Sequence, residues 1–377
     1  MNLVRLTAAK AVANTALRWV PPFLPVLEKA FGATTGQMTT ALGIGEMSGL
    51  STFAVGKHLD RGRERVVMTL SLLAVAVSSL VSLFGTTFTF AIGFVLVVLG
   101  VANCTVAGHA YISHRVAYSE RARSIGLYET SWALALLVGA PIIAGLIAVF
   151  GWRGPYVVLA IGATAMAAMI WGSTEAARPA PAATDPAPTP GLAAITPAAW
   201  AVIVGSALLA MAGLSVFAIS GSWLDDAFGV STGGLGAVAM AFGAIELIAS
   251  VGSAGFADRI GKFRSTMAGI ALMVSGQAVM ALADETLWIG VVGILLFLCG
   301  FEFAFVTSLS LVTEAMPAAR GTTIAASNAV GTVARGSGTI ASGWLFGIHG
   351  VEGTLTMSAI AAAGATTAFG LSRRRRV

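Results

Sequence analysis

The chain has 377 residues, of which 56% are hydrophobic and only 10% are charged. A soluble domain carries about a quarter charged residues, so this composition excludes an ordinary soluble protein and indicates a membrane protein. The formal net charge is +5, but the basic residues follow the pattern of membrane loops described below, which argues against nucleic-acid binding.

A membrane-spanning helix needs about 20 largely apolar residues to cross roughly 30 Å of hydrocarbon. Twelve stretches of the chain meet this requirement. In chain order they are residues 4–27, 36–56, 66–84, 87–112, 123–149, 154–173, 198–224, 232–255, 265–282, 286–312, 321–347 and 350–370. We therefore predict an all-α membrane protein with twelve transmembrane helices. Lys10 and Arg18 in the first stretch argue against a cleavable signal peptide.

Basic residues gather in alternate loops. They lie at residues 57–65, 115–123, 259–264 and 373–376, whereas two of the intervening loops carry Asp225-Asp226 and Asp284-Glu285. The positive-inside rule assigns the basic loops to the cytoplasm, and twelve spans then place both termini there as well. The sequence predicts a multi-pass protein of the cytoplasmic (inner or plasma) membrane whose terminal arginines contact anionic lipid.

One basic loop occurs twice. Residues Gly56 to Arg65 read GKHLDRGRER, and residues Gly255 to Arg264 read GFADRIGKFR, about half the chain later. Each copy follows one long apolar segment and precedes another. The recurrence predicts two pseudo-symmetric six-helix bundles, as in transporters whose substrate site lies near the midplane between repeats.

A stretch rich in Pro and Ala, residues 174–197, separates the two halves. Proline removes backbone donors and favours extended chain, so this stretch is predicted to be a cytoplasmic linker. The predicted domains are an N-terminal bundle at 1–173, the linker at 174–197, and a C-terminal bundle with a basic tail at 198–377.

Over its whole length the chain resembles the major facilitator superfamily of transporters. The two loops and the six-plus-six layout carry the resemblance. Residues 139–145 (GAPIIAG) add to it because they are similar to the Gly-Pro-x-x-Gly-Gly pattern of the drug/metabolite–proton antiporter branch. The sequence departs from that branch at Ala140 and Ala144, where the pattern has glycine, and at residues 98–104, which lack the Arg usual in segment four.

The resemblance implies a monomer in which segments one, four, seven and ten line a central cavity. It also implies that the loop latches the outward-facing state. The gating residues it assigns are Gly56, Asp60, Arg61, Arg63 and Arg65 in the first copy and Asp258 and Arg259 in the second. From the chemistry alone, Gly56 allows neighbouring helices to approach closely, and Asp60 can accept hydrogen bonds from arginines. A basic loop that only sets topology remains the alternative.

Ionisable residues inside spans cost roughly 2.5–3.5 kcal/mol on insertion scales, so they mark a pathway, a pair or a proton relay. We single out six that lie clearly within predicted segments: Arg18, Glu46, Glu129, Glu246, Glu302 and Arg335. A structural interpretation pairs Arg18 with Glu46 and Glu302 with Arg335, which lie at similar heights. The functional interpretation makes Glu302 the first candidate proton carrier, because segment ten faces the cavity in the family. Glu46, Glu246 and Glu129 follow as proton-coupling candidates, and Arg18 and Arg335 as groups that contact substrate or control charge.

The same cavity-facing segments carry further candidates for substrate contact. These are Asn14, Trp19, Asn103, His109, Phe217 and Trp223. Histidine is the side chain suited to a charge change near neutral pH, although a lone histidine near a helix end, such as His109, is more often a structural group.

The sequence thus predicts a secondary active transporter that moves a small organic molecule by alternating access, as a proton-coupled exporter of amphipathic compounds. A carrier that takes up or exchanges organic carboxylates through the midplane arginines is the alternative. A non-transporting membrane sensor is a third, remote interpretation. The sequence shows no catalytic triad, metal-ligand cluster or phosphate-binding loop, so neither an enzyme nor a cofactor is predicted. The predicted partners are a small-molecule substrate, protons and the lipid bilayer, with the proton gradient as driving force.

Overall fold

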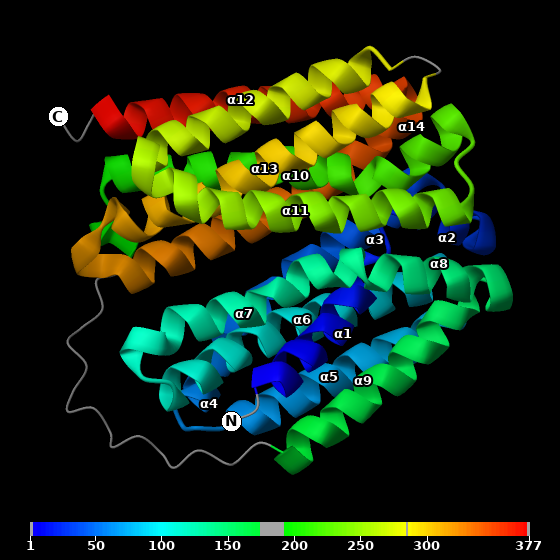
Figure 1. Ribbon diagram of the computed structural model, residues 1–377, viewed down its shortest axis with the longest axis horizontal. Coiled ribbons are helices and arrows are strands. Elements are labelled where there is room, and N and C mark those ends of the chain that lie inside the picture. The colour runs from blue at the N-terminus through cyan, green and yellow to red at the C-terminus, as the bar shows by residue number, and fades with distance from the viewer. Residues whose placement is uncertain (1–2, 174–191, 284–285, 375–377) are drawn as a thin grey trace. The chain divides into compact units, whose positions relative to one another are not determined.

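The computed structural model describes residues 3–173, 192–283 and 286–374, and every regular element in these ranges is a helix (Figure 1). The α-helices are α1 (Leu3–Arg18), α2 (Leu24–Phe31), α3 (Thr35–Met47), α4 (Thr52–Leu59), α5 (Glu64–Ser82), α6 (Thr87–Arg115), α7 (Tyr118–Leu137), α8 (Gly139–Phe150), α9 (Arg153–Ser173), α10 (Pro197–Phe228), α11 (Thr232–Ile260), α12 (Lys262–Ala281), α13 (Leu287–Ala315) and α14 (Arg320–Arg374). Three short 3₁₀ helices are η1 (Ser48–Ser51), η2 (Leu192–Ala194) and η3 (Pro317–Ala319).

In the described residues these elements group into twelve spans, which confirms the predicted helices. Three spans are broken: the first, the second, in which η1 separates α3 from α4, and the fifth. The first changes from α1 to α2 around Pro21-Pro22, because proline lacks the amide donor that a continuous helix needs. The fifth breaks at Val138, between α7 and α8. α14 holds the last two spans, which meet at Gly350 with φ 63° and ψ −159°.

Several helices run further than their apolar stretches. α10 continues through the predicted acidic loop at Asp225-Asp226 and ends at Gly229, whose φ of 63° is left-handed. A left-handed glycine ends a helix without the steric cost that a Cβ would bring. Helix ends can project beyond the hydrocarbon. The apolar stretch therefore sets the length that crosses the membrane, whereas the capping residue sets where the helix ends.

The duplicated basic loop is a tight helix-to-helix turn in both copies. α4 passes to α5 through Gly62 (φ 72°), and α11 passes to α12 through Gly261 (φ 87°). Only glycine adopts such angles at little cost, which explains why both copies of the loop have glycine at this position. The expectation for Gly56 is not met, since a Cβ built there meets no atom within 4 Å.

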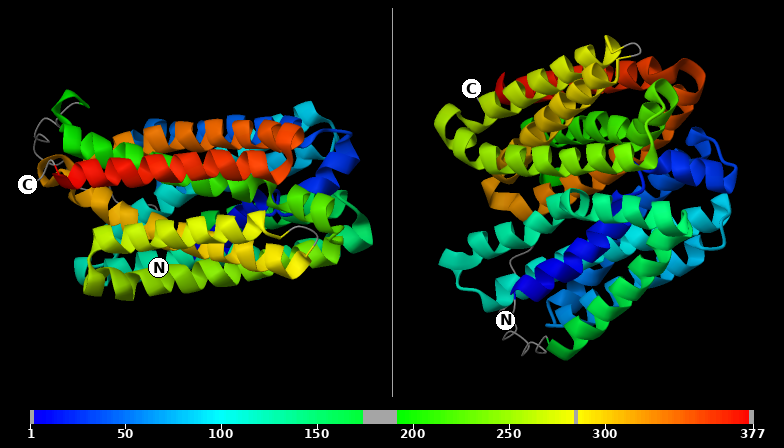
Figure 2. Two further views of the ribbon diagram at one scale, coloured as in Figure 1. Left: turned by 90° about the horizontal axis from the view of Figure 1, so that it is seen from above. Right: turned by 45° about the vertical axis from the view of Figure 1, so that its right-hand side comes forward.

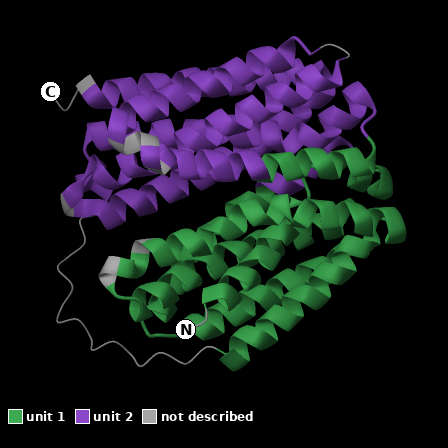
Figure 3. Ribbon diagram, in the orientation of Figure 1, with its two compact units in different colours: residues 1–33, 44–185, 231–243 green, residues 34–43, 186–230, 244–377 purple. Residues whose placement is uncertain are grey.

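By its internal contacts the chain divides into two compact units. One comprises residues 1–33, 44–185 and 231–243, and the other 34–43, 186–230 and 244–377 (Figure 3). The predicted division at 1–173, 174–197 and 198–377 stays a prediction, and residues 174–191 of the linker lie outside the described part. The two short segments 34–43 and 231–243 group with the other half of the sequence, for reasons given below.

Small residues set the helix packing within each unit. In the second unit α12 and α13 lie side by side (Figures 1 and 2). A Cβ at Gly276 would lie 2.3 Å from the Phe297 amide nitrogen, and a Cβ at Gly300 would lie 2.2 Å from that of Met273. Glycine is required where two backbones approach this closely, which is a common way for membrane helices to associate.

Candidate functional site

The first unit contains a partly buried charge cluster formed by α1, α6 and α7. The Lys10 Nζ lies 2.6 Å from the Glu129 Oε1, and the His109 Nε2 lies 2.5 Å from the same oxygen. The Lys10 side chain is 2% exposed, whereas those of Glu129 and His109 are 44% and 37% exposed. One carboxylate is thus held between a buried ammonium and an accessible imidazole.

Tyr128 forms the wall of this cluster. The Lys10 Nζ lies 4.3 Å from the centre of the Tyr128 ring, and His109 meets that ring edge-on with 5.6 Å between centroids. The Tyr128 hydroxyl donates to the Cys104 carbonyl oxygen at 3.0 Å. A Cβ at position 108 would lie 2.2 Å from the Tyr128 Oη, so Gly108 makes room for the phenol. The aromatic face stabilises the ammonium by a cation–π contact.

The cluster is the first of three successive polar contacts between α1 and α7, which we call a polar seam. One turn further along α1, the Asn14 Nδ2 donates to the Ser131 Oγ at 3.2 Å, and neither residue is exposed. The Arg18 Nη1 donates to the Trp132 carbonyl oxygen at 2.8 Å, and its guanidinium lies 4.2 Å from the centre of the Trp132 indole.

The register of the seam follows from helix geometry. Lys10, Asn14 and Arg18 are spaced four residues apart, which places them on one face of α1. Lys10 was not among the predicted site residues, although it lies in the first apolar stretch. Its four-residue spacing from Asn14 and Arg18 is the signal that could have found it.

The charges of Lys10 and Glu129 compensate each other. Ionisable groups are costly within a membrane unless they are paired, and Glu129 supplies the negative charge that compensates Lys10. Protonation of the Glu129 carboxyl would remove that compensation and weaken both of its contacts. The side chains of Glu129 and His109 are partly exposed, whereas the Lys10 side chain is buried.

The other predicted proton carriers lie on other helices. The Ser250 Oγ of α11 donates to the Glu302 Oε1 of α13 at 2.7 Å. Glu246 is buried in α11, and Glu46 is half-buried in α3. The Arg335 Nη2 donates to the Thr332 Oγ1 at 3.1 Å within α14. The predicted pairings of Arg18 with Glu46 and of Glu302 with Arg335 stay predictions, as do the roles of these residues.

Most of the predicted substrate-contact residues lie in packed surroundings. Trp19 is 0% exposed and meets the Tyr156 ring edge-on, with 5.2 Å between the ring centroids. Asn103 donates to the Ser51 Oγ and to the Leu99 carbonyl oxygen, each at 2.9 Å. Trp223 and Phe217 are buried in α10. A direct contact of these four residues with substrate stays a prediction.

The first copy of the basic loop contains a buried carboxylate that the sequence analysis did not single out. Glu64, the first residue of α5, is 0% exposed and pairs with His114, and the Arg115 Nη1 lies 3.8 Å from its Oε1. The Arg65 guanidinium lies 4.4 Å from the centre of the Trp171 indole. The sequence signal was the acidic residue within a run of arginines.

The predicted gating residues of both loops lie mostly at the surface. Asp60, Arg61 and Arg63 are exposed in the first copy, and Arg259 is exposed in the second. The side chain of Asp258 lies outside the described part of the structure. Gating by these residues stays a prediction.

Two glycine-lined seams explain why segments 34–43 and 231–243 group with the other half of the sequence. In the second unit, the Trp344 Nε1 of α14 donates to the Thr40 Oγ1 at 3.1 Å, and a Cβ at Gly43 would lie 2.3 Å from the Gly336 carbonyl oxygen. In the first unit, a Cβ at Gly243 would lie 2.4 Å from the Leu137 amide nitrogen. We call these the α3–α14 seam and the α11–α7 seam.

Twelve spans, a repeated turn and charges held between helices define the class of secondary membrane transporters. The described residues contain no group of three or more His, Cys, Asp or Glu that could hold a metal ion. A family model described as the Major Facilitator Superfamily matches residues 6–339. The chain therefore belongs to the major facilitator superfamily, and it is a multi-pass membrane transporter, not an enzyme.

Individual relatives agree with this assignment. The chain is 24% identical over 344 residues to an uncharacterized MFS-type transporter, YceJ, of Bacillus subtilis (strain 168), which covers 89% of this chain and 86% of the relative. A bacterial homologue of the human lysosomal transporter Spinster, solved in an inward-facing and occupied conformation, superposes with a TM-score of 0.76 at 14% identity, covering 99% of this chain and 96% of that one. A D-xylose–proton symporter superposes with a TM-score of 0.75 at 14% identity, covering 96% of each chain. At these identities the solved structures show the fold alone.

Proposed function

We propose that this protein is a proton-coupled transporter that exports small amphipathic organic compounds across the cytoplasmic membrane by alternating access, and that Glu129 exchanges the coupling proton. The observation that carries the proposal is the Lys10–Glu129–His109 cluster. It assigns the proton to Glu129, because this carboxylate lies within a predicted span and contacts two basic groups, the buried Lys10 and the accessible His109.

The cluster couples protonation to the position of a helix. When Glu129 is ionised, its carboxylate ties α7 to Lys10 of α1 and to His109 of α6. When Glu129 is protonated, the buried Lys10 ammonium loses its counter-charge, which raises the free energy of that arrangement. A protonation step therefore favours a different packing of α7 against α1, and a ligand that favours one packing changes its population.

The two seams support alternating access. The α3–α14 and α11–α7 seams each bring a segment from one half of the sequence against helices of the other half at backbone distance. Close packing over glycines is the kind of contact that can separate and re-form. The Trp344–Thr40 hydrogen bond adds a polar contact between side chains of the α3–α14 seam.

The test uses proteoliposomes loaded at acidic pH, diluted into alkaline buffer and given the lipophilic cation ethidium. Wild-type protein should accumulate ethidium as protons leave, and nigericin should abolish the accumulation. Glu129→Gln should lose it, whereas Glu120→Gln should not, because Glu120 is an exposed residue in the first turn of the same helix. Ethidium accumulation by Glu129→Gln equal to the wild type would refute the assignment of the proton site.

A folding defect needs a separate control, because Glu129→Gln leaves the buried Lys10 without its carboxylate. The double variant Lys10→Met/Glu129→Gln removes both charges and should fold. It should still lack gradient-driven transport, since the proton-binding carboxyl is gone. Gradient-driven accumulation in this folded double variant would also rule out Glu129 as the coupling residue.

The alternative function is the uptake or exchange of organic carboxylates. It is favoured by two buried cationic residues on one face of α1, Lys10 and Arg18. Labelled benzoate should then exchange across proteoliposomes without a pH gradient, and Arg18→Gln should abolish the exchange. Benzoate exchange without ethidium movement would replace the export proposal by this one.

A further inference from the structure

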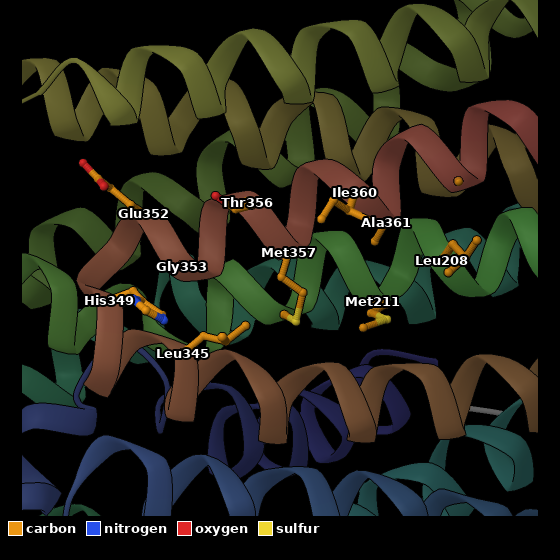
Figure 4. A pocket seen from close by; sticks show the side chains of 11 residues that line it. Leu208, Met211, Leu345, His349, Glu352, Gly353, Thr356, Met357, Ile360 and Ala361 are labelled. Atoms are coloured by element: carbon orange, nitrogen blue, oxygen red, sulfur yellow. The ribbon is translucent and has the colours of Figure 1, made fainter.

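A groove in the second unit lies outside the charge cluster and the two seams. It has a volume of about 800 Å³ and is formed by α10 and both limbs of α14 (Figure 4). Its wall is largely apolar and includes Leu208 and Met211 of α10 and Met357 and Ile360 of α14. His349 and Glu352, on either side of the Gly350 break, lie at one end, and Leu208 lies toward the other (Figure 4).

The groove opens onto the surface that the bilayer covers. Ile360 lines it and is 68% exposed, within a limb that spans the membrane. Hydrocarbon is the solvent for an apolar side chain at that depth. A surface that is exposed, apolar and hollow in this position fits an acyl chain.

Its length matches one leaflet. The lining residues of the second limb run from Glu352 to Gly364, and twelve helical steps of 1.5 Å give about 18 Å. Half of a hydrocarbon core of roughly 30 Å is about 15 Å. The polar end lies at the helix break, where the chain reaches the interface, so a lipid seated here would place its tail along the groove and its headgroup beside His349 and Glu352.

The charge at the polar end selects the headgroup. Glu352 is an exposed carboxylate, and neither α10 nor residues 336–372 contain any Lys or Arg. An anionic headgroup would find no basic partner on these elements beyond the imidazole of His349. A headgroup that carries a primary ammonium can donate to the Glu352 carboxylate while its phosphate approaches His349.

We propose that this groove is a binding site for one phospholipid with a primary-ammonium headgroup, in the leaflet opposite the basic loops. The site is separate from the proton cluster. The proposal of a lipid site is independent of which substrate the transporter carries.

The test compares phosphatidylethanolamine and phosphatidylglycerol of identical acyl chains, each added to delipidated wild-type protein. Native mass spectrometry measures the bound lipid, and the melting temperature reports its effect on folding. We expect one tightly bound phosphatidylethanolamine, with an apparent affinity about two- to fivefold above that of phosphatidylglycerol, as expected for one exposed ion pair. Equal binding of the two lipids by the wild type would overturn the headgroup assignment.

Three variants locate the site. Glu352→Gln should remove the preference for phosphatidylethanolamine and keep basal lipid binding. Gly364→Leu should lower the binding of both lipids, because its side chain enters the groove beside the movable end of Leu208, whose Cδ1 would lie 3.0 Å from the new Cβ. Gly347→Leu is the matched control, since it lies on the first limb outside the lining, with nothing within 4 Å of its Cβ.

Circular dichroism and size-exclusion profiles equal to those of the wild type establish that each variant is folded. A folded Gly364→Leu protein that binds phosphatidylethanolamine as the wild type does would show that the lipid sits elsewhere. Loss of phosphatidylethanolamine binding in folded Gly347→Leu would likewise show that the lipid sits outside the groove.

Discussion

The Lys10 ammonium lies 2.6 Å from the Glu129 carboxylate although the two residues are far apart in the sequence and only Glu129 is accessible. The asymmetry matters for stability. Removing the lysine leaves an exposed carboxylate that still contacts His109, whereas removing the carboxylate charge leaves a buried ammonium with only an aromatic face beside it.

Glu129→Gln is therefore expected to destabilise the protein more than Lys10→Met. An uncompensated buried charge costs several kcal/mol, and we expect roughly 2–4 kcal/mol for Glu129→Gln and about 1 kcal/mol for Lys10→Met. The double variant should be more stable than Glu129→Gln alone. Reversible unfolding in mixed micelles measures the three values as a double-mutant cycle. Strictly additive effects would mean that the pair does not interact.

Alanine substitutions at Gly62 and Gly56, two glycines of the first basic loop, should differ in their effect on stability. Gly62 has a left-handed φ of 72°, so Gly62→Ala should cost about 1–2 kcal/mol. Gly56 lies within α4 and has open space around it, so Gly56→Ala should be neutral or stabilise the helix by up to about 1 kcal/mol. Melting temperatures of the two variants make the comparison, and a similar loss in both would contradict it.

A bulky residue at Gly43 should separate the α3–α14 seam, because a Cβ there would lie 2.3 Å from the Gly336 carbonyl oxygen. We expect a cysteine introduced by Thr40→Cys to react several-fold faster with a membrane-impermeant maleimide when Gly43→Leu is also present. Gly347→Leu, where a side chain meets open space, serves as the control background. Unchanged labelling with Gly43→Leu would mean that the seam tolerates the side chain and does not act as a closure.

Neutralising Glu64 should weaken the turn between α4 and α5. Glu64→Gln leaves His114 and Arg115 without the buried carboxylate that they share, and we expect a loss of roughly 1–3 kcal/mol. Glu120→Gln, at an exposed position, should have no measurable effect. Unfolding midpoints decide between these outcomes, and equal midpoints for the two variants would show that Glu64 contributes nothing.

The spans were predictable because hydrophobic length and charge placement are properties of the local sequence. Twenty apolar residues must cross the bilayer wherever they occur, and the basic loops between them fix the topology. The helix ends were less predictable. α10 extends past Asp225-Asp226 because a left-handed cap at Gly229 ends it, and hydropathy does not report caps.

The candidate site was only partly predictable. Glu129, His109, Asn14 and Arg18 were named from the sequence, but their neighbours were not. The contact of Arg18 with Trp132 was not predicted, and its pairing with Glu46 stays a prediction. Lys10 was overlooked although it shares a face of α1 with Asn14 and Arg18.

The sequence by itself determined that this is a duplicated, twelve-span membrane transporter, because apolar length, basic loops and a repeated glycine turn act over a few residues. Only the tertiary structure decided that Lys10 and His109 share the Glu129 carboxylate, and that α10 and α14 enclose a groove. The rotation and tilt of a membrane helix are set by its packing against neighbouring helices. Those contacts join residues that are distant in the chain, and no local pattern records them.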